Sequence, residues 1–232
     1  DLYRIVYQEH EKLKQCWEEQ FQANYGVFRP VVRETLNKYL SCGILAHGAA
    51  RAQCPDCNHS RLIAFSCKCR GFCPSCGAKR AIIFAETLDQ SILKPVPHRH
   101  CVFSIPKRIR PYFKYDRSLL GILFTAAWQS ILQMYQEIFP EATPAAVLTA
   151  QTAGDALNFN PHLHGIIADG VFCPEGEFHH LTLNTNKLNE LFRHKVLGSM
   201  QEKELLHNTV VEQLLTWKNS CFNTCLSAVA LA

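Results

Sequence analysis

Two pairs of cysteines carry the clearest metal-binding pattern in this sequence. Cys54-Pro-Asp-Cys57 and Cys73-Pro-Ser-Cys76 are C-x-x-C motifs with 15 residues between them. Structural zinc prefers four ligands at the corners of a tetrahedron, and each C-x-x-C turn can supply two thiolates. We therefore predict a structural Zn²⁺ site whose ligands are Cys54, Cys57, Cys73 and Cys76. Four protein ligands leave no open position, so this metal would stabilise the fold and would not catalyse a reaction.

Further cysteines leave the ligand set open. The chain has 12 cysteines, and six of them, including Cys67 and Cys69, lie between residues 54 and 76. Cys67 is the best alternative ligand, and His59 is a weaker one. A redox-active dithiol is another interpretation of a C-x-x-C motif, but two matched pairs favour a metal. Cysteines gathered in one segment without a secretion signal indicate a reducing cytoplasm.

A second constellation is the histidine pair in Asn160-Pro-His162-Leu-His164-Gly165. Side chains alternate between the two faces of a β-strand, so His162 and His164 are expected on one face and Leu163 on the other. Two adjacent imidazoles form half of a metal site, and Gly165 would leave room beside them. The competing interpretation is two half-exposed histidines without a ligand. His98, His100, His179 and His180 are expected to have ordinary surface roles.

Positive charge is concentrated in the middle of the chain. Residues 51–117 contain 13 Lys and Arg against 4 Asp and Glu, although the whole chain has a net charge of only +4. Such a segment is typical of proteins that bind polyanions, and a solvated basic face is the alternative. The residues we expect to contact DNA phosphates are Lys68, Arg70, Lys79 and Arg80 near the cysteines, and Lys107, Arg108 and Arg110 further along.

The hydrophobic pattern predicts an α+β protein in two parts. Helices are expected at 1–24, 30–42 and 78–93, and Pro95 and Pro97 mark a boundary. Residues 1–94 would form a helical and zinc-ribbon domain, and residues 95–232 an antiparallel sheet with flanking helices. Strands are expected at 99–105, 145–152, 161–172 and 178–183, a basic helical stretch after Pro106, and helices at 116–139, 186–198 and 200–217. No apolar run is long enough to span a membrane.

Several longer motifs resemble one transposase family. The histidine pair resembles the metal-binding motif of the HUH endonuclease superfamily, which cuts single-stranded DNA. The order of the motifs resembles the rolling-circle insertion-sequence transposases of the IS91 type, which place a zinc-binding domain before an HUH-type nuclease. The stretches that carry this resemblance are Arg29-Pro-Val-Val-Arg-Glu-Thr-Leu36, Cys42-Gly-Ile-Leu-Ala-His-Gly48, Ser66-Cys-Lys-Cys-Arg-Gly-Phe-Cys-Pro-Ser-Cys-Gly-Ala-Lys-Arg80, Phe103-Ser-Ile-Pro-Lys-Arg108 and Ala156-Leu-Asn-Phe-Asn-Pro-His-Leu-His-Gly165.

The resemblance implies a transposase that binds DNA, cleaves a single strand with the help of a metal and transfers it. The histidine pair and a third polar ligand would hold Mg²⁺ or Mn²⁺ against the scissile phosphate. Gln151 is the candidate for that third ligand, with Asp155 and Asp169 as rivals. The strand that ends in Phe103-Ser-Ile-Pro106 would lie beside the histidine strand. The expected partner is single-stranded DNA at insertion-sequence ends, in the cytoplasm of a bacterium and at the nucleoid when DNA is bound.

The nucleophile that the family requires is a tyrosine downstream of the histidines. This chain has seven tyrosines, and none follows Tyr135. Residues 219–232 also lack the resemblance, so we expect an incomplete nuclease domain that lacks the nucleophile. Tyr112 and Tyr115 are expected to be ordinary packing or surface residues. Two alternatives remain open: a non-catalytic zinc-ribbon DNA-binding protein, and a zinc-stabilised interaction module without a nucleic-acid role.

Overall fold

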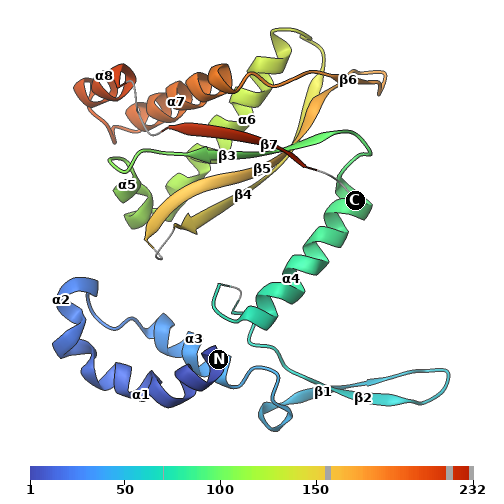
Figure 1. The fold of residues 1–232 in the computed structure, drawn as a ribbon, viewed down its shortest axis with the longest axis vertical. Helices are drawn as coiled ribbons and strands as arrows, with labels where there is room; N and C mark the ends of the chain where they lie inside the picture. Colours follow the sequence, from blue (N-terminus) through green and yellow to red (C-terminus); the bar gives the residue numbers. More distant parts are fainter. Residues whose placement is uncertain (70, 155–157, 218–221, 230–232) are drawn as a thin grey trace. The chain divides into compact units, whose positions relative to one another are not determined.

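The computed structural model describes residues 1–69, 71–154, 158–217 and 222–229. The chain divides into two compact units, Asp1–Lys94 and Pro95–Ala232, which we call unit 1 and unit 2 (Figure 1). The expected α+β class, with antiparallel strands and flanking helices, is confirmed. No helix in the described ranges is both long and apolar enough to cross a lipid bilayer.

Unit 1 consists of helices and one hairpin. It contains α1 (Leu2–Gln20), α2 (Gln22–Tyr25), α3 (Pro30–Leu40), the 3-10 turn η1 (Leu45–His47), β1 (Ala49–Gln53), β2 (Ser60–Ala64), α4 (Pro74–Thr87) and the π-helical turn η2 (Leu88–Ile92). β1 and β2 pair in antiparallel register, from Ala49 opposite Ala64 to Gln53 opposite Ser60. Proline occupies the first position of both α3 and α4, where its missing N–H costs no helical hydrogen bond. For this reason α4 begins four residues before the expected start at residue 78.

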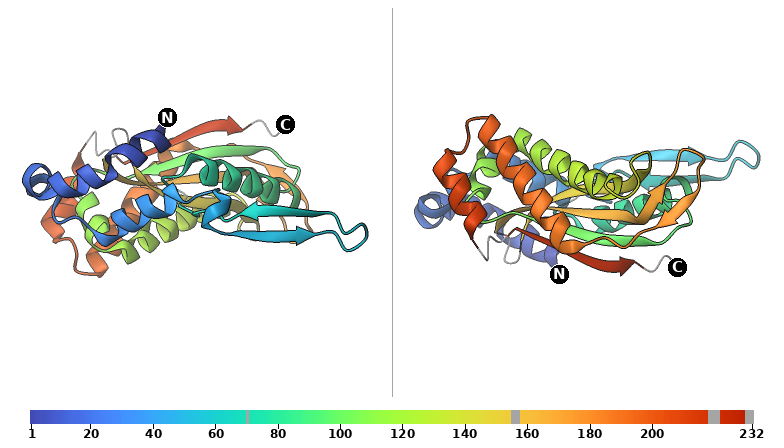
Figure 2. Two further views of the ribbon diagram at one scale, coloured as in Figure 1. Left: turned by 90° about the horizontal axis from the view of Figure 1, so that it is seen from below. Right: turned by 90° about the horizontal axis from the view of Figure 1, so that it is seen from above.

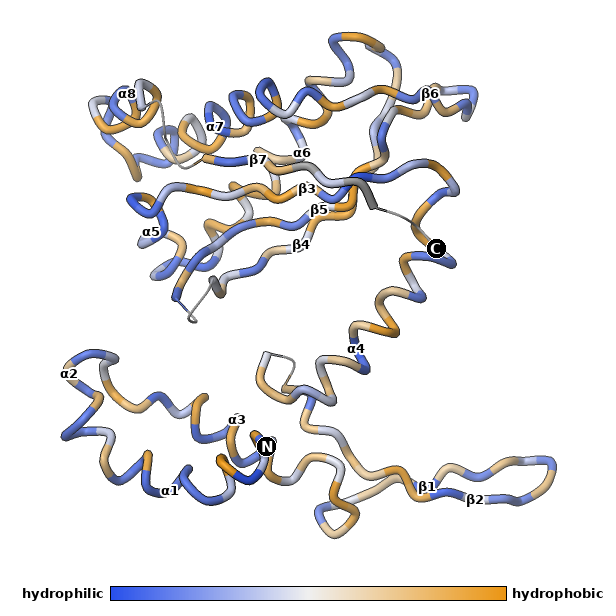
Figure 3. Tube along the Cα trace, in the orientation of Figure 1, coloured by the Kyte–Doolittle hydropathy of each residue, from blue (hydrophilic) through white to orange (hydrophobic). Residues whose placement is uncertain are grey.

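The core of unit 1 is small. Its buried cluster consists of Val6, Tyr39 and Cys73, with partly buried side chains packed around it. Many large apolar side chains of unit 1 are exposed, among them Ile5, Val31 and Phe84. α1 also carries many hydrophilic residues along its length (Figure 3). A domain with so few buried side chains gains little stability from the hydrophobic effect.

Unit 2 is built on an antiparallel sheet. Its strands are β3 (His98–Ser104), β4 (Thr143–Ala153), β5 (Phe159–Phe172), β6 (Phe178–His180) and β7 (Asn223–Val229). The strand order is β4-β5-β3-β7, and β6 pairs with the far end of β5. β3 and β5 are neighbours, as expected, with Val102 opposite His164 and Ser104 opposite His162. β7 was not predicted, and it pairs with the other edge of β3.

Helices cover one face of this sheet. α6 (Leu120–Gln136) and α7 (Thr185–Glu202) lie side by side against it (Figure 2), and the shorter elements are α5 (Arg110–Tyr115), η3 (Arg117–Leu119) and α8 (Asn208–Thr216). Between helices and sheet lies a core of fully buried side chains that includes Phe103, Ile131, Leu163, Ile167 and Phe192. The alternation predicted for the histidine strand is thereby reproduced, because Leu163 faces the core and its two neighbours do not.

Several element boundaries differ from the sequence-based expectation. The first of the two C-terminal helices is longer than predicted, because α7 continues to Glu202 where residue 198 was expected to end it. The strand expected at 178–183 ends at His180. The basic stretch after Pro106 is a turn, and the helix begins only at Arg110, with Pro111 in its first turn. Gly165 also has another role than expected: an added Cβ would lie 2.7 Å from Leu148, so this glycine allows close packing on the core face and does not make room for the histidines.

Candidate metal centres

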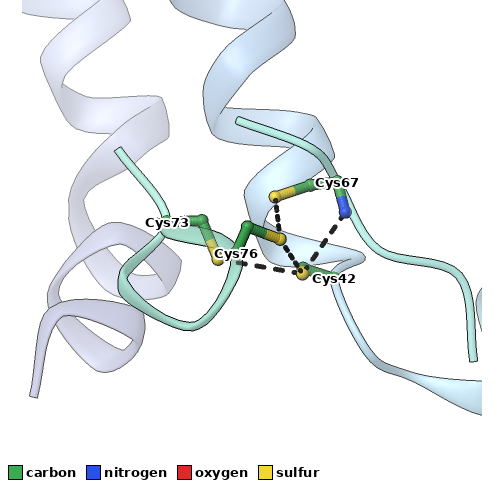
Figure 4. Close-up of side chains that lie close together, drawn as sticks. All are labelled: Cys42, Cys67, Cys73 and Cys76. Carbon is green, nitrogen blue, oxygen red and sulfur yellow. Dashed lines mark hydrogen bonds between the residues drawn. The ribbon is translucent and has the colours of Figure 1, made fainter. Parts of the chain in front are cut away.

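Four cysteines of unit 1 converge on one point. The Sγ atoms of Cys42, Cys67, Cys73 and Cys76 all lie within 4.8 Å of one another (Figure 4). The Sγ–Sγ distances are 3.8 Å for Cys42–Cys73, 3.6 Å for Cys42–Cys76 and 3.6 Å for Cys67–Cys76. In a tetrahedron with Zn–S bonds of about 2.3 Å, the corners are about 3.8 Å apart. The spacing of these four thiols therefore fits a single zinc ion.

Local structure brings the four cysteines together from separate segments. Cys42 follows the end of α3, and Gly43 takes a left-handed conformation (φ 74°) and donates its N–H to the Phe65 carbonyl oxygen. Cys67 follows β2, and its N–H donates to Cys42 Sγ at 3.4 Å. Cys73 is the N-cap of α4, and Cys76 lies in the first turn of that helix. The cluster thus links α3, the end of the hairpin and α4.

The environment of these thiols suits metal binding. Burial raises the pKa of the Cys42 and Cys67 thiols. Burial also opposes the ionisation of Cys76, but hydrogen bonds from the Cys67 and Cys42 thiols and from the Lys68 backbone outweigh it and lower the Cys76 pKa to about 7. One thiolate is therefore accessible near neutral pH, and a bound cation would favour ionisation of the other three.

Cys54 and Cys57, two of the four zinc ligands predicted from the sequence, do not join this cluster. They lie in the turn at the end of the hairpin, where the Cys54 N–H donates to the carbonyl oxygen of His59. Each strand of the hairpin has five residues. At about 3.3 Å per residue, the turn therefore lies about 16 Å from the end of the hairpin that leads to Cys67. Cys42 was missed because it precedes the C-x-x-C motifs and carries no spacing signal of its own, whereas Cys67 was the alternative ligand that the sequence indicated.

Three of the predicted DNA-contacting residues lie beside the cysteine cluster. Lys68, Lys79 and Arg80 line a hollow of 420 Å³, together with Ser66 and Ser75 and the cysteines Cys42 and Cys76. Side-chain hydroxyls and cations around a concave surface can bind phosphate oxygens. The fourth predicted residue, Arg70, lies outside the described residues.

The histidine pair lies on the sheet face of unit 2 that is opposite to the helices. His162 and His164 share this face with Gln151 and Thr149 of β4, because Gln151 pairs with His162 and Thr149 with His164. The two imidazole centroids are 4.9 Å apart, and their planes are inclined at 61°. Both side chains are half-buried. The structure thus places Gln151 next to the histidines, in the position expected of a third ligand.

Hydrogen bonds indicate which ring nitrogens are available. His162 Nδ1 lies 2.7 Å from the carbonyl oxygen of Asn160, so Nδ1 carries the proton and Nε2 has the free lone pair. His164 Nε2 is buried and has no hydrogen-bond partner among the described residues. Burial, with smaller contributions from His162 and His100, lowers the pKa of His164 and favours the neutral imidazole, which is the form that binds metals.

A third histidine belongs to this group, although we expected it to have an ordinary surface role. His100 Nε2 lies 2.9 Å from His164 Nδ1, and the two rings are nearly parallel with centroids 5.1 Å apart. His100 comes from β3, diagonally across from His164, so only the strand register brings it here. The three histidines do not surround one point, since the four cysteines are the only set of potential ligands in the described ranges whose atoms converge within 4.8 Å.

Asp169 is excluded as the third ligand of the histidine pair. It lies seven residues from His162 along β5, an odd step that places its side chain on the core face. There Arg99 Nε lies 2.7 Å and His180 Nε2 3.0 Å from its carboxylate oxygens. The carboxylate is thus engaged in a mostly buried ion pair, and His180 has a structural partner that the sequence did not indicate. The other rival, Asp155, lies outside the described residues.

A basic groove lies at the end of β5 that carries the histidines. Lys107, Arg110 and Lys114 line it together with Asn158 and Phe159, and its volume is 270 Å³. The Arg117 guanidinium lies 4.8 Å from the centroid of the Phe159 ring. Arg110 also donates from Nε to the carbonyl oxygen of Ile105.

Arg108, which was also predicted to contact DNA, is directed toward the C-terminal helix. Its guanidinium lies 3.4 Å from Gln213 Oε1 and 5.9 Å from the centroid of the Trp217 ring. It therefore bridges the turn before α5 to the region of α8 and does not line the groove.

Tyr135 lies on the core side of the sheet, away from the face that carries the histidines. Tyr135 is 2% exposed and donates its hydroxyl to the carbonyl oxygen of Ala168 on the core side of the sheet. Tyr112 packs against the core, and Tyr115 is exposed on α5. Burial raises the pKa of Tyr135 far above its usual value, with a smaller contribution from Asp169, so this hydroxyl stays protonated.

Known proteins match both units. Residues 12–105 match the family described as "Transposase zinc-binding domain" of the IS91 type, and residues 146–227 match the family described as "Putative transposase". The transposase for insertion sequence element IS801 from Pseudomonas savastanoi pv. phaseolicola is 30% identical over 191 residues, which cover 79% of this chain and 45% of that protein. "Putative transposase y4qJ" from Sinorhizobium fredii (strain NBRC 101917 / NGR234) is 26% identical over 162 residues, which cover 68% and 40%.

The matched region is therefore less than half of either relative, so this chain spans only part of the length of these proteins. No solved structure matches the chain significantly.

Proposed function

Because this chain belongs to the IS91-type family of insertion-sequence transposases, we propose that it binds DNA and holds a divalent cation on the histidine face of unit 2. The observation that carries this proposal is the arrangement of His162 and His164. Both rings lie on one sheet face and have their Nδ1 engaged, and the buried Nε2 of His164 has no partner among the described residues.

The cysteine cluster is proposed as the structural zinc site of unit 1. The family description supplies the metal, and the spacing of Cys42, Cys67, Cys73 and Cys76 supplies the ligand set. Four thiolates complete the preferred coordination of zinc, so this ion would have no position left for a substrate. Its role is to hold α3, the hairpin and α4 together.

The family resemblance implies Mg²⁺ or Mn²⁺ on the histidine face, whereas imidazole nitrogens alone favour softer transition metals. His162, His164 and Gln151 would contribute two imidazole nitrogens and one amide oxygen, which leaves room for water and for phosphate oxygens. The unpartnered, buried Nε2 of His164 supports this assignment, because a buried polar atom without a partner is costly unless a ligand satisfies it. A cation bound there would polarise a phosphodiester and stabilise the charge that develops on it.

The basic groove beside α5 is proposed to hold the DNA strand that enters this site. Lys107, Arg110 and Lys114 would contact phosphates, and Phe159, with Arg117 over its ring, offers an aromatic surface for a base. Phe159 begins the strand that carries the histidines but packs on its core side, so a DNA strand bound in the groove would have to pass the end of β5 to reach the histidine face. These contacts recognise the backbone of DNA and not its sequence.

We propose that none of the tyrosines in the described ranges is the nucleophile for strand cleavage. Tyr135 is buried on the opposite side of the sheet, and no tyrosine follows it in the printed sequence. We therefore propose that the chain as given binds metal and single-stranded DNA but forms no covalent link to DNA.

The second candidate function is a zinc-dependent DNA-binding protein whose histidine face binds no metal. The hollow beside the cysteine cluster favours it, because Lys68, Lys79 and Arg80 surround that hollow without any contribution from unit 2. The two candidates differ in one measurable property, the second metal site.

Titration of the zinc-loaded chain with Mn²⁺, followed by electron paramagnetic resonance, tests the metal site. We expect one bound Mn²⁺ in the unaltered chain and none in the His162→Ala/His164→Ala variant. His179→Ala is the matched control, because it removes a histidine from β6 that takes no part in the site. Equal binding by all three proteins, or none by the unaltered chain, would refute the proposed cation site.

A DNA-binding experiment tests the second part of the proposal. Fluorescence anisotropy with a single-stranded oligonucleotide should show binding that weakens as salt is added. Lys107→Gln/Lys114→Gln should bind several-fold more weakly than the control Lys203→Gln, which removes a charge at the end of α7. The same oligonucleotide labelled at its 3′ end should form no covalent complex with the protein in the presence of Mn²⁺, and a covalent band would contradict our account of the tyrosines.

A further inference from the structure

His100 holds a position that the family resemblance and the histidine motif do not explain. It lies on β3, outside the His162–His164 motif, and yet its Nε2 is 2.9 Å from His164 Nδ1. Such a short separation between two neutral imidazole nitrogens requires that one donates a proton and the other accepts it. Which ring donates determines whether His164 can bind a metal.

Only one of the two possible arrangements leaves His164 able to bind a metal. If His100 Nε2 were the donor, His164 would carry its proton on Nε2 and could not offer a lone pair there. If His164 Nδ1 is the donor, its Nε2 has a free lone pair, and that atom is the buried one without a partner. His162 is arranged in the same way, because its Nδ1 donates to the Asn160 carbonyl oxygen.

We infer that His100 is a positioning residue, which accepts a hydrogen bond from His164 Nδ1 and thereby fixes the tautomer and ring orientation in which His164 Nε2 faces the metal. This inference rests on the proposed cation site. The two ligands then have different supports, a backbone carbonyl for His162 and the imidazole of His100 for His164. Partners of this kind behind a metal-bound histidine are commonly worth 10- to 100-fold in metal affinity.

The geometry argues against His100 as a ligand in its own right. His100 Nε2 is already occupied by His164, and the atoms of the three rings do not converge on one point. The rings of His100 and His164 are nearly parallel, inclined at 15°, with centroids 5.1 Å apart. His100 therefore acts through His164.

Nuclear magnetic resonance can test the tautomer directly in the unaltered protein. Long-range ¹H–¹⁵N spectra of the metal-free histidine face, recorded on the zinc-loaded chain at mildly alkaline pH, distinguish a proton on Nδ1 from one on Nε2. We expect His164 to be protonated on Nδ1 in the unaltered chain and to be a mixture of tautomers in His100→Ala. A proton on His164 Nε2 in the unaltered chain would overturn the inference.

Mn²⁺ affinity provides the second readout. His100→Ala should bind Mn²⁺ about 10- to 100-fold more weakly. His100→Gln should recover most of the loss, because the side-chain amide oxygen can accept the same hydrogen bond. Unchanged affinity in His100→Ala would refute the positioning role.

The two proposals fail in different ways. If the unaltered chain binds no Mn²⁺, the proposed cation site is wrong. In that case the NMR spectrum still tests the role of His100, because a proton on His164 Nδ1 supports the inference and a proton on Nε2 overturns it. Should His100→Ala not fold, the spectrum of the unaltered chain and the behaviour of His100→Gln remain decisive.

Discussion

Unit 1 and unit 2 bury their apolar side chains to very different extents. Unit 2 has a continuous core between its sheet and α6 and α7, with Phe103, Leu163 and Phe192 fully buried. The cluster in unit 1 has only Val6, Tyr39 and Cys73 as buried members, and four of the side chains packed against it are cysteines. In unit 1 the thiols therefore occupy the place that aliphatic and aromatic side chains occupy in unit 2.

This contrast bears on the two metal sites that we propose. A small domain with little apolar burial commonly depends on a metal for its stability, and the free energy of metal binding then contributes to folding. Unit 2 has an extensive core, so the cation that we propose on its histidine face would not be needed for folding. We therefore expect loss of metal to unfold unit 1 and to leave unit 2 intact.

The largest predicted effect is that of zinc removal. Structural zinc sites in small domains contribute an apparent binding free energy of about 10 to 16 kcal/mol, so a strong chelator should abolish the folded state of unit 1. Hydrogen exchange should show loss of protection in residues of α3 and α4, while β3 and β5 remain protected. If both units lost protection to the same extent, the folding of unit 2 would depend on zinc as much as that of unit 1, contrary to this prediction.

Cysteine variants test which thiols bind the zinc ion. Cys42→Ser should lose zinc and destabilise unit 1, whereas the matched variant Cys54→Ser should keep one zinc per chain, because Cys54 lies in the hairpin turn away from the cluster. Mass spectrometry under native conditions measures the zinc content. If Cys54→Ser lost zinc and Cys42→Ser kept it, the result would support the ligand set predicted from the sequence.

The next effect concerns the core of unit 2. Phe192 is fully buried, and its ring centroid lies 5.0 Å from that of Phe103. Phe192→Ala should lower the free energy of unfolding by about 3 to 5 kcal/mol, since it leaves a cavity in a packed interior. Phe84→Ala on α4 is the control, because that side chain is 46% exposed and its loss should cost less than about 0.5 kcal/mol. Urea unfolding of the zinc-loaded chain gives both values.

A smaller effect is expected at the ion pair of Asp169. Asp169→Asn removes the charge that neutralises Arg99 on the core face, and this should lower the free energy of unfolding by about 1 to 3 kcal/mol. Mn²⁺ binding should not change, because Asp169 faces away from the histidines. Glu177→Gln, which affects only an exposed pair with His179, should have no measurable effect on stability. Loss of Mn²⁺ binding in Asp169→Asn would mean that our assignment of sheet faces is wrong.

Local patterns predicted β3, β4, β5 and β6 and the orientation of the histidine pair, but not β7. The alternation along β5 placed Leu163 in the core and both histidines on the other face, and this is what the structure shows. The expected neighbourhood of β3 and β5 is also confirmed. The structure gathers Cys73 and Cys76 with Cys42 and Cys67 and not with Cys54 and Cys57, because the C-x-x-C spacing describes a turn and does not show how the turn is joined to other segments.

The sequence by itself determined the features that depend on residues close together in the chain. These are the periodicity of helices and strands, the two imidazoles on one face of a strand, and the presence of thiols that can bind a metal. What only the tertiary structure decided was which distant residues meet these groups. Cys42 and Cys67 reach Cys73 and Cys76 through the way α3 and the hairpin pack, and His100 reaches His164 through the register of β3 against β5. The physical reason is that such contacts depend on where separate segments pack, which no spacing within one segment specifies.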